Sequence, residues 1–411
     1  MMTEFPKGWE TCKLGEICKI KARIGWRGLS ANEYTEDGPF LIAGKHIRDG
    51  QVLWGNCDHI SEWRYDESPE IQIQEGDVIL SKDGTIGRPA HILALPDKTT
   101  INGTMMLLRP ETQKLDPAYL FQQLGGFQFK TLVKERISGG SIPHIFQRDM
   151  VNLPIARPPL EEQKKIAEVL SSVDEAIRAT QAVIEQTRTV KKGLLQKFFH
   201  RGDWEPNKDK ALPDEFEVRL LDDLAKRGSG HTPNKKKTEY WGGGIKWVSL
   251  QDTKKLDRLY IKETTAEISD LGITNSSAVL HPKGMVVLSR DATVGKSAIT
   301  TEPMAVSQHF IAWDCGPDLD RYYFYYWLQH MKPVFLNIGA GSTIKTIGLS
   351  FFKKLGIPIP AISEQRRVGQ KMKELDELLF LHEQKLTQLK TLKAGLMSDL
   401  LTGRVRVKVA S

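Results

Sequence analysis

Two long segments of the sequence carry the same helical pattern, and this duplication constrains the fold more than any other feature. The first begins at Pro158 and reads PPLEEQKKIAEVLSSVDEAIRATQAVIEQTRTVKKGLLQKFFHRG. The second begins at Pro360 and reads PAISEQRRVGQKMKELDELLFLHEQKLTQLKTLKAGLMSDLLTGR. Apolar positions match at a constant shift of 202 residues and alternate by four and three, which is the spacing of a helix that buries one narrow seam.

Each predicted helix spans roughly 60 Å at about 1.5 Å per residue, which is longer than the core of a domain of this size. We therefore expect the two helices to pair with each other, and because a globular block lies between them, to pair antiparallel. Lys191 and Lys393 are polar members of the seam and would help to fix its register. The predicted interface positions are Ile166, Leu170, Val173, Ile177, Ile184 and Leu194 in the first copy, and Val368, Met372, Leu375, Leu379, Leu386 and Leu396 in the second.

The repeat extends beyond the helices. GDVILSKDGTIG (76–87) matches GMVVLSRDATVG (284–295), and SGGSIPHIFQRDMVNLPIARPP (138–159) matches GAGSTIKTIGLSFFKKLGIPIP (339–360). A duplication of roughly 200 residues in fixed order is a stronger signal than any single motif. Each half also predicts buried strands (78–81, 286–289) and aromatic-rich helices (119–125, 322–331). The expected fold is therefore mixed α and β: two tandem α/β blocks with an internal pseudo-twofold duplication, joined by the long helices.

Composition narrows the class of protein. The 411 residues have a formal net charge of +7 and a pI near 9.0, which weakly favours a polyanionic partner. No run of about eighteen apolar residues predicts a membrane span, and the first fifteen residues do not resemble a signal peptide. Four cysteines without metal-ligand spacing indicate reduced thiols in a cytoplasmic protein.

Catalytic motifs are missing from the sequence. We find no glycine-rich AdoMet loop, no [DNS]PP[YF] motif of amino-methyltransferases, no HExxH and no other metal-ligand cluster. Gly295-Lys296-Ser297 resembles the end of a P-loop, but Arg290 stands where the first glycine is required. We therefore expect no catalytic residue, no metal and no cofactor in this chain, and a role in binding.

The matched turns are the best candidates for contacting a ligand. SKDGTIGR (81–88) and SRDATVGK (289–296) follow predicted strands with cations, hydroxyls and glycine, which suit phosphates or base edges. The structural alternative is a strand–turn–strand in which Asp83 and Asp291 cap their own backbone. Ala292 replaces Gly84, so the two turns need not share one conformation. The candidate DNA-binding residues are Lys82, Thr85, Arg88, Ser141 and His144, and Arg290, Thr293, Lys296, Thr343 and Lys345.

Ser141, His144, Thr343 and Lys345 precede the long helices, where a glycine hinge is the structural alternative. The tryptophans have an alternative too, because a large aromatic side chain can pack a core or stack on a base. For five of them we expect core packing. These are Trp26, Trp54, Trp63, Trp241 and Trp247.

These residues resemble the specificity subunits of type I restriction–modification systems. The resemblance rests on the GWE…LG start, the VILSKDGTIG and VVLSRDATVG turns, the GGS…P and GST…I segments, and above all the helix starts PLEEQKKIAEVLSSVDEAI and PAISEQRRVGQKMKELDELL. It covers both halves of the chain. It implies target-recognition domains at 1–157 and 203–359, conserved long helices at 158–202 and 360–403, and a tail at 404–411.

The family resemblance implies a function. Each recognition domain would read one half of a bipartite, asymmetric site in double-stranded DNA, while an antiparallel coiled coil sets the spacer and docks two modification subunits. Those subunits would bind AdoMet and flip and methylate adenines. Restriction subunits would cleave unmethylated DNA with ATP and Mg²⁺. This chain would orient DNA without catalysis.

Three alternatives remain open at this stage. The partner could be a fused nuclease–methyltransferase of a related system. The chain could itself be an enzyme with an unfamiliar site, in which case the purified protein alone would methylate or cut DNA. It could also be a scaffold, which predicts no salt-sensitive binding to duplex DNA.

Overall fold

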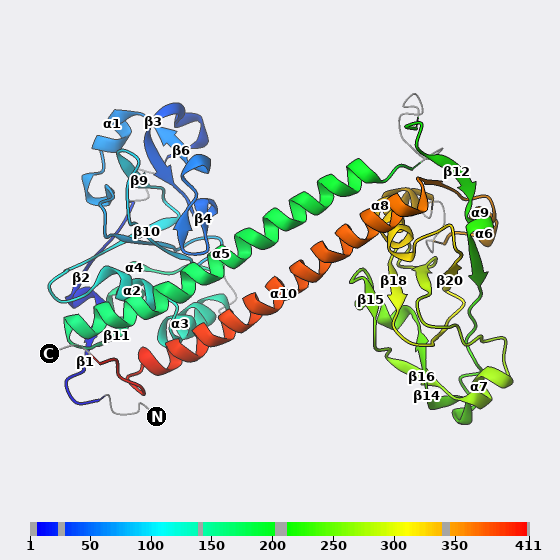
Figure 1. Cartoon of the computed structure of the whole chain (residues 1–411). Helices are drawn as coiled ribbons and strands as arrows, with labels where there is room; N and C mark the ends of the chain where they lie inside the picture. The colour runs from blue at the N-terminus through cyan, green and yellow to red at the C-terminus, as the bar shows by residue number, and fades with distance from the viewer. Residues whose placement is uncertain (1–5, 24–28, 139–142, 202–211, 339–345, 409–411) are drawn as a thin grey trace. The chain divides into compact units, whose positions relative to one another are not determined.

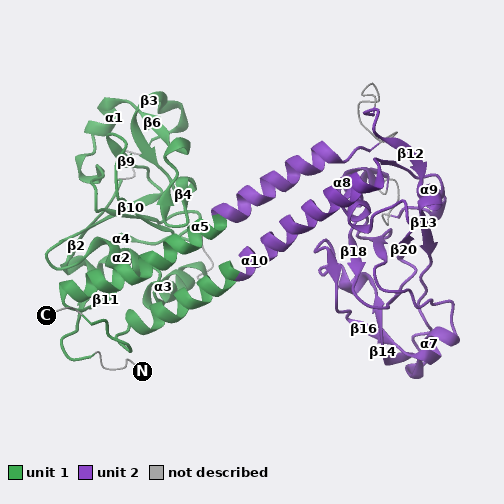
Figure 2. Ribbon diagram, in the orientation of Figure 1, with its two compact units in different colours: residues 1–181, 385–411 green, residues 182–384 purple. Residues whose placement is uncertain are grey.

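The structure, a computed structural model, describes residues 6–23, 29–138, 143–201, 212–338 and 346–408. The chain forms two compact units: unit 1 contains residues 1–181 and 385–411, and unit 2 contains residues 182–384 (Figure 2). Two helices of 39 residues each, α5 (Leu160–Phe198) and α10 (Ile362–Leu400), are shared between the units. Both units are mixed α and β, and each contains a stretch of both long helices.

Unit 1 is built on an antiparallel four-stranded sheet with a smaller sheet beside it (Figure 1). The larger sheet has the order β2 (Cys18–Ala22), β10 (Met105–Pro110), β7 (Val78–Ser81), β8 (Pro89–His91). The smaller has the order β6 (Asp58–Ile60), β3 (Tyr34–Ile42), β9 (Thr99–Ile101), with β3 and β9 parallel. Among the described residues, unit 1 also has two strand pairs and four short α-helices: β1 (Glu10–Lys13) with β11 (Pro154–Arg157), β4 (Ile47–Arg48) with β5 (Gln51–Val52), α1 (Glu62–Asp66), α2 (Pro117–Gln123), α3 (Phe127–Ser138) and α4 (Gln147–Val151).

Unit 2 follows the same plan with one more strand in its larger sheet. That sheet has the order β13 (Ala225–Gly228), β20 (Phe310–Cys315), β17 (Val286–Ser289), β18 (Ser297–Thr300), β15 (Tyr260–Ile261). The smaller sheet has the order β16 (Ala266–Ile268), β14 (Trp241–Val248), β19 (Ala305–Val306). The remaining elements are β12 (Glu217–Leu220), which pairs with β21 (Gly356–Ile359), and α6 (Leu221–Leu224), α7 (Asp270–Thr274), α8 (Arg321–Ile338) and α9 (Leu349–Lys353).

The predicted strands at 78–81 and 286–289 are confirmed as β7 and β17, and both are buried on their two faces. Successive side chains of a strand point to opposite faces. In β7, Val78 and Leu80 therefore pack with the helices, while Ile79 packs toward the smaller sheet. In β17, Val286 and Leu288 face the helices, and Val287 lies in the opposite cluster. Continuous apolar runs suit strands covered on both sides.

The long helices begin just after the prolines with which the two repeated segments open. The carbonyl of Pro159 accepts from the backbone N–H groups of Glu162 and Gln163, and the carbonyl of Ala361 accepts from those of Glu364 and Gln365. Pro159 therefore lies just before the first helical residue, and Pro360 lies one residue further out. After α10, Gly403 adopts a left-handed φ of +72°, a conformation that favours glycine where a helix ends.

The glutamine of each helix start has a structural role. Gln163 is 1% exposed; its Nε2 donates to the carbonyls of Lys114 (3.0 Å) and Pro158 (2.9 Å), and its Oε1 accepts from the N–H of Asp116 at 2.9 Å. Gln365 is also 1% exposed and makes the same three bonds, with Asp318, Pro360 and Asp320. The amide ties the start of the long helix to the loop before α2 in unit 1 and before α8 in unit 2, and so explains the repeated glutamine.

Each unit pairs its own two stretches of long helix. In unit 1, Lys393 Nζ lies 2.6 Å from Asp174 Oδ1, and Arg406, just beyond α10, lies 2.6 Å from Glu162. In unit 2, Lys191 binds Asp376, and Arg188 lies 2.7 Å from Glu383. In both units, higher-numbered residues along α5 meet lower-numbered residues along α10, so the two stretches run in opposite directions.

The predicted seam positions are buried or half-buried in both helices. Ile166 and Leu170 belong to the core of unit 1, and Val368 and Met372 to the core of unit 2. None of the described helices is long and apolar enough to cross a membrane. All four cysteines are free thiols, and burial raises the pKa of Cys18 and Cys315 to about 12, which keeps both neutral.

Candidate nucleic-acid interface

The turn that follows β7 in unit 1 is held by its own serine. Ser81 Oγ donates to the carbonyl of Thr85 at 2.7 Å and accepts from the N–H of Arg88 at 2.9 Å. The backbone of Lys82 links this turn to two other segments: its N–H donates to the carbonyl of Thr104, and its carbonyl accepts from the N–H of Ile145. The turn is therefore anchored both to the sheet and to the segment before the long helix.

The turn that follows β17 in unit 2 is anchored in the same way. The N–H of Arg290 donates to the carbonyl of His309 at 2.9 Å, and its carbonyl accepts from the N–H of Ile347 at 2.9 Å. Ser289 Oγ lies 3.1 Å from Thr293 Oγ1 and donates to the carbonyl of Asp291. The two loops that match in sequence thus occupy matched positions in their units.

The replacement of Gly84 by Ala292 does not change the backbone region of the turn. Gly84 has φ +70° and Ala292 has φ +56°, both left-handed. An L-residue with a Cβ pays roughly 1–2 kcal/mol for this conformation. The anchored ends of the turn impose it in unit 2, so the sequence difference did not indicate a different loop.

The two turn aspartates bind imidazoles instead of capping their own backbone. Asp83 accepts from Lys82 Nζ at 2.6 Å and contacts His144 Nδ1. Burial opposes ionisation of Asp83, but the hydrogen bonds from Lys82 and His144 outweigh it and lower the pKa of its carboxyl. In unit 2, Asp291 Oδ2 lies 2.9 Å from Nδ1 of His309. The predicted backbone caps of Asp83 and Asp291 were therefore wrong, because each carboxylate contacts a histidine instead.

The candidate cations differ in whether their side chains already donate hydrogen bonds within their own unit. Arg290 donates to the carbonyls of Gln308 and Ile347, both at 3.1 Å, and Lys296 Nζ donates to the carbonyl of Thr253 at 2.8 Å. Thr85 and Arg88 are exposed, and in the described part of the chain their side chains make no hydrogen bond or ion pair. These two are the predicted residues most available to a ligand.

His144, Lys82 and Asp83 form one cluster in unit 1. Three other candidates, Ser141, Thr343 and Lys345, lie outside the described residues, so the expected surface before the helices is described only through His144.

One expectation about the aromatics was wrong. Trp63, on α1, is 68% exposed and does not pack a core; Arg64 lies 5.1 Å from the centre of its ring. Its neighbours, Glu62 and Arg64, are both charged, which was the available signal for a surface position. By contrast, Trp247 is buried and donates from Nε1 to the carbonyl of His231, as a core tryptophan should. Trp26 lies outside the described residues.

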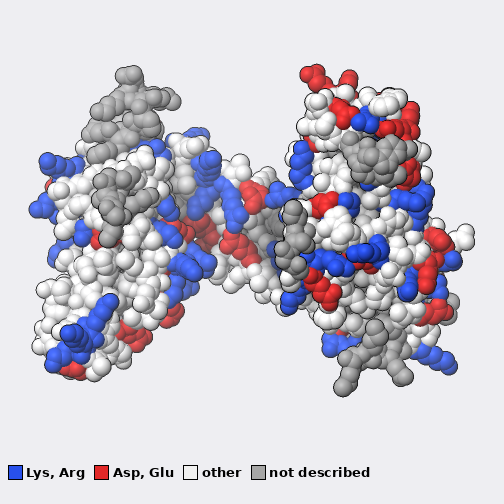
Figure 3. Space-filling view, turned by 180° about the vertical axis from the view of Figure 1, so that it is seen from behind, with Lys and Arg blue, Asp and Glu red and all other residues white. Residues whose placement is uncertain are grey.

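On the face of the molecule seen in Figure 3, basic side chains are spread over both units. On the face shown in Figure 3, lysine and arginine are interleaved with aspartate and glutamate. In the ranges that the structure describes, no three His, Cys, Asp or Glu side chains are grouped to hold a metal ion. The arrangement offers anchored turns with exposed hydroxyl and guanidinium groups, which can donate to phosphates or to base edges.

Comparisons with known proteins assign the class of protein. The family described as type I restriction modification DNA specificity domain matches residues 6–187 and again 213–391. The chain therefore belongs to this family, and the match to two successive segments corresponds to the two halves of the sequence.

Relatives span the whole chain. The type I restriction enzyme MjaVIII specificity subunit of Methanocaldococcus jannaschii is 26% identical over 98% of this chain and 94% of its own. The crystal structure of a type I restriction–modification S subunit from M. genitalium has the same fold, with a TM-score of 0.64, 15% identity and 96% of both chains covered. A chain from a type I R-M system studied for complex assembly aligns with a TM-score of 0.53 and 19% identity over 98% of this chain and 100% of its own.

Proposed function

We propose that this chain is the subunit that gives a type I restriction–modification enzyme its DNA specificity, with one recognition domain for each half of a bipartite, asymmetric site. The domains are residues 1–157 and 203–359. Family membership supports the role, and the matched turns of the two units support the division into two readers.

The observation that carries the proposal is a repeated joint between the long helices. Lys393 binds Asp174 in unit 1, and Lys191 binds Asp376 in unit 2; both partners are displaced by 202 residues, the shift of the sequence repeat. In unit 1 the lysine lies on α10 and the aspartate on α5, and in unit 2 the lysine lies on α5 and the aspartate on α10. This exchange is what a pseudo-twofold axis between two antiparallel helices requires. This pairing supports the internal duplication and a spacer of fixed length.

The helices would also dock the partner subunits. Outside the seam, α10 exposes Leu378, Phe380 and Leu381, by 41%, 55% and 60%. Exposed apolar groups in one stretch of helix suit a protein partner. We assign this surface to two modification subunits, which would carry AdoMet. Restriction subunits would supply ATP- and Mg²⁺-dependent cleavage in the cytoplasm, and this chain would hold no cofactor and catalyse no step.

The test is a genome-wide map of methylated adenines in the source cell, with this gene present and deleted. We expect the deletion to remove one bipartite motif that is methylated on both strands. If no motif is lost, the complex reconstituted with its modification subunits is tested for sequence-specific duplex binding, and a failure there would refute the proposal. The purified chain alone should neither methylate nor cut DNA, which separates this role from that of an enzyme.

A further inference from the structure

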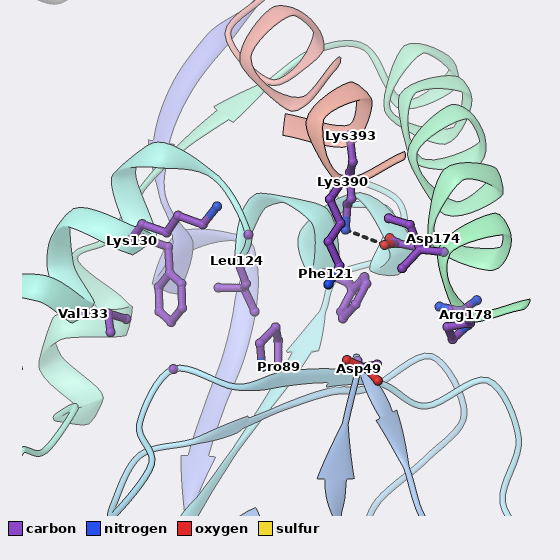
Figure 4. A pocket seen from close by; sticks show the side chains of 15 residues that line it. Asp49, Pro89, Phe121, Leu124, Lys130, Val133, Asp174, Arg178, Lys390 and Lys393 are labelled. Carbon is purple, nitrogen blue, oxygen red and sulfur yellow. Dashed lines mark hydrogen bonds and ion pairs between the residues drawn. The ribbon is translucent and has the colours of Figure 1, made fainter. Parts of the chain in front are cut away.

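Unit 1 contains a cavity of about 430 Å³ beside the turn that follows β7 (Figure 4). Its walls come from the turn between β4 and β5, from α2 and α3, and from the unit 1 stretches of α5 and α10. Phe121, Leu124 and Pro89 give it an apolar wall. Every lining residue belongs to unit 1.

The charges around this cavity are unbalanced. Four cations and two carboxylates line it, a formal excess of two positive charges: Lys130, Arg178, Lys390, Lys393, Asp49 and Asp174. Lys393 and Asp174 bind each other at 2.6 Å, and the other carboxylate, Asp49, has Arg48 at 3.8 Å. Within the described ranges, the side chains of Lys130, Arg178 and Lys390 make no hydrogen bond or ion pair.

Unit 2 shows how the same position is neutralised. The residue that matches Lys390 at the shift of 202 is Arg188, which lies 2.7 Å from Glu383 and 3.0 Å from Glu185. At the matched positions in unit 1, these two carboxylates are replaced by Gln181 and Thr387. Lys390 therefore has a charge but neither of the two acidic partners.

Two further differences between the units concern the lining of the cavity. The residue that matches Arg178 is Phe380, so unit 1 has a cation where unit 2 has an apolar side chain. Beside the matched turn glycine, Gly295, lies Lys332, whose Nζ is 2.6 Å from Asp257. Beside Gly87 in unit 1 lies the apolar Val133. The apolar Val133 can form no such ion pair.

We propose that this cavity is a binding site for phosphate groups, with Lys130 at one end, Arg178 at the other and Lys390 between them as its cations (Figure 4), and with Phe121 as a flat neighbour for a ring attached to a phosphate. A guanidinium and ammonium groups together suit phosphate oxygens, and a concave wall of low polarity strengthens their attraction. The phosphate can belong to the DNA backbone or to a free nucleotide. The site does not depend on the proposed role in DNA recognition, because the second source needs no DNA.

The first experiment titrates inorganic pyrophosphate into the full chain by calorimetry. The triple variant Lys130→Gln/Arg178→Gln/Lys390→Gln should weaken binding at least tenfold. Lys134→Gln, one turn further along α3 and outside the cavity, is the matched control and should bind like the wild type. Gln181→Glu/Thr387→Glu restores the carboxylates of unit 2 around Lys390 and should weaken binding without removing any cation.

The second experiment measures the affinity of the same variants for a duplex of fixed length over a series of salt concentrations. If the phosphate belongs to DNA, the triple variant should bind about tenfold more weakly, and the slope of log K against log salt should be shallower by about 1 for each DNA phosphate that the variant no longer neutralises. Reduced pyrophosphate binding with unchanged DNA binding would instead assign the site to a free phosphate ligand. Both results support the site.

An unchanged response of the triple variant to both probes, with its unfolding transition equal to that of the wild type, would overturn the proposal. Failure of the proposed DNA function is distinguishable, because the wild type would then not bind duplex DNA at all, whereas its pyrophosphate titration would be unaffected.

Discussion

Within each unit, a lysine–aspartate pair links the stretch of α5 to the stretch of α10. The two units differ in the side chain that donates a further hydrogen bond to the aspartate. In unit 1, Asp174 also accepts from Gln122 Nε2 at 2.9 Å. In unit 2, Asp376 accepts from the hydroxyl of Tyr326 at 2.8 Å. Burial, followed by the nearby Asp376, raises the pKa of Tyr326 and keeps its hydroxyl a donor. The lysine–aspartate pair is therefore the same in both units, while the further donor to the aspartate comes from α2 in unit 1 and from α8 in unit 2.

The comparison predicts first that each unit reads DNA independently. Replacing residues 1–157 by the corresponding domain of another specificity subunit should change one half of the methylated motif completely and leave the other unchanged. Sequencing of methylated adenines measures the outcome. The reciprocal exchange of residues 203–359 is the control and should change only the other half of the motif. A change of both halves by either exchange would contradict the proposal that each domain reads one half-site.

A second prediction concerns the helices that both units share. Inserting one heptad after Gln181 and another after Gln384 preserves the seam and lengthens each helix by about 10 Å. The spacer of the methylated motif should then grow by about 3 base pairs, with both half-sites retained. Insertions of five residues at the same places turn the seam by about 140° away from its partner and should abolish the pairing of the helices. An unchanged spacer after the heptad insertion would show that the length of the helices does not set the spacer.

The third prediction tests whether the two cores are equally sensitive at the seam. Leu170 and Met372, matched and fully buried, belong to the cores of unit 1 and unit 2. Leu170→Ala and Met372→Ala should each cost about 2–5 kcal/mol in the free energy of unfolding, through lost burial and a cavity. Hydrogen exchange of peptides from each unit should show the loss of protection in the unit that carries the substitution.

Leu381→Ala is the control for these two variants. The side chain is 60% exposed, so the substitution should change stability by no more than about 0.5 kcal/mol. A loss of several kcal/mol there would mean that α10 is packed differently from the structure.

The fourth prediction addresses the constant joint. Lys393→Met and Lys191→Met each leave a partly buried aspartate without its cation, and each should cost about 1–3 kcal/mol. Lys164→Met breaks the exposed pair with Glu161 and should cost well below 1 kcal/mol. Urea unfolding measures all three, and equal effects would show that the joint has no special role.

The smallest effect distinguishes the two left-handed aspartates, Asp49 (φ +50°) and Asp257 (φ +61°). Asp257 accepts from Lys332 at 2.6 Å and Gln329 at 2.9 Å, so Asp257→Asn should cost about 1 kcal/mol. Among the described residues, the ionic partner of the Asp49 side chain is Arg48, which is exposed and lies 3.8 Å away, and Asp49→Asn should change the free energy of unfolding by less than about 0.5 kcal/mol. Asparagine tolerates the same backbone conformation, so the difference isolates the side-chain bonds.

The sequence predicted the parts of the fold that depend on periodicity and repetition. The long helices and the seam residues followed from their spacing, because a buried face imposes its period on the sequence. The strands β7 and β17 followed from short continuous apolar runs before a turn. The function of the repeated glutamine did not follow, because the partners of Gln163 are backbone carbonyl and N–H groups, which carry no signature in the sequence.

The candidate interface was less predictable for a related reason. Lys82 and Arg290 are cations beside a turn in both copies, and nothing in their spacing reveals that Arg290 donates to two carbonyls of its own unit. The cations of the cavity, Lys130, Arg178 and Lys390, come from three helices that are far apart in the sequence. Only the fold brings them together, although the absence of acidic partners like those of Arg188 is visible once the two helices are aligned.

The division of the chain also sets an order of events during synthesis. Leu400 and Leu401 belong to the same core as Leu14 and Val78, at the other end of the chain. On a ribosome that adds about 5–20 residues per second, the codons for residues 182–384 take on the order of 10–40 s to translate before the second part of unit 1 begins. For that interval the nascent first block holds part of its core surface open to water, where a chaperone or a second nascent chain can reach it.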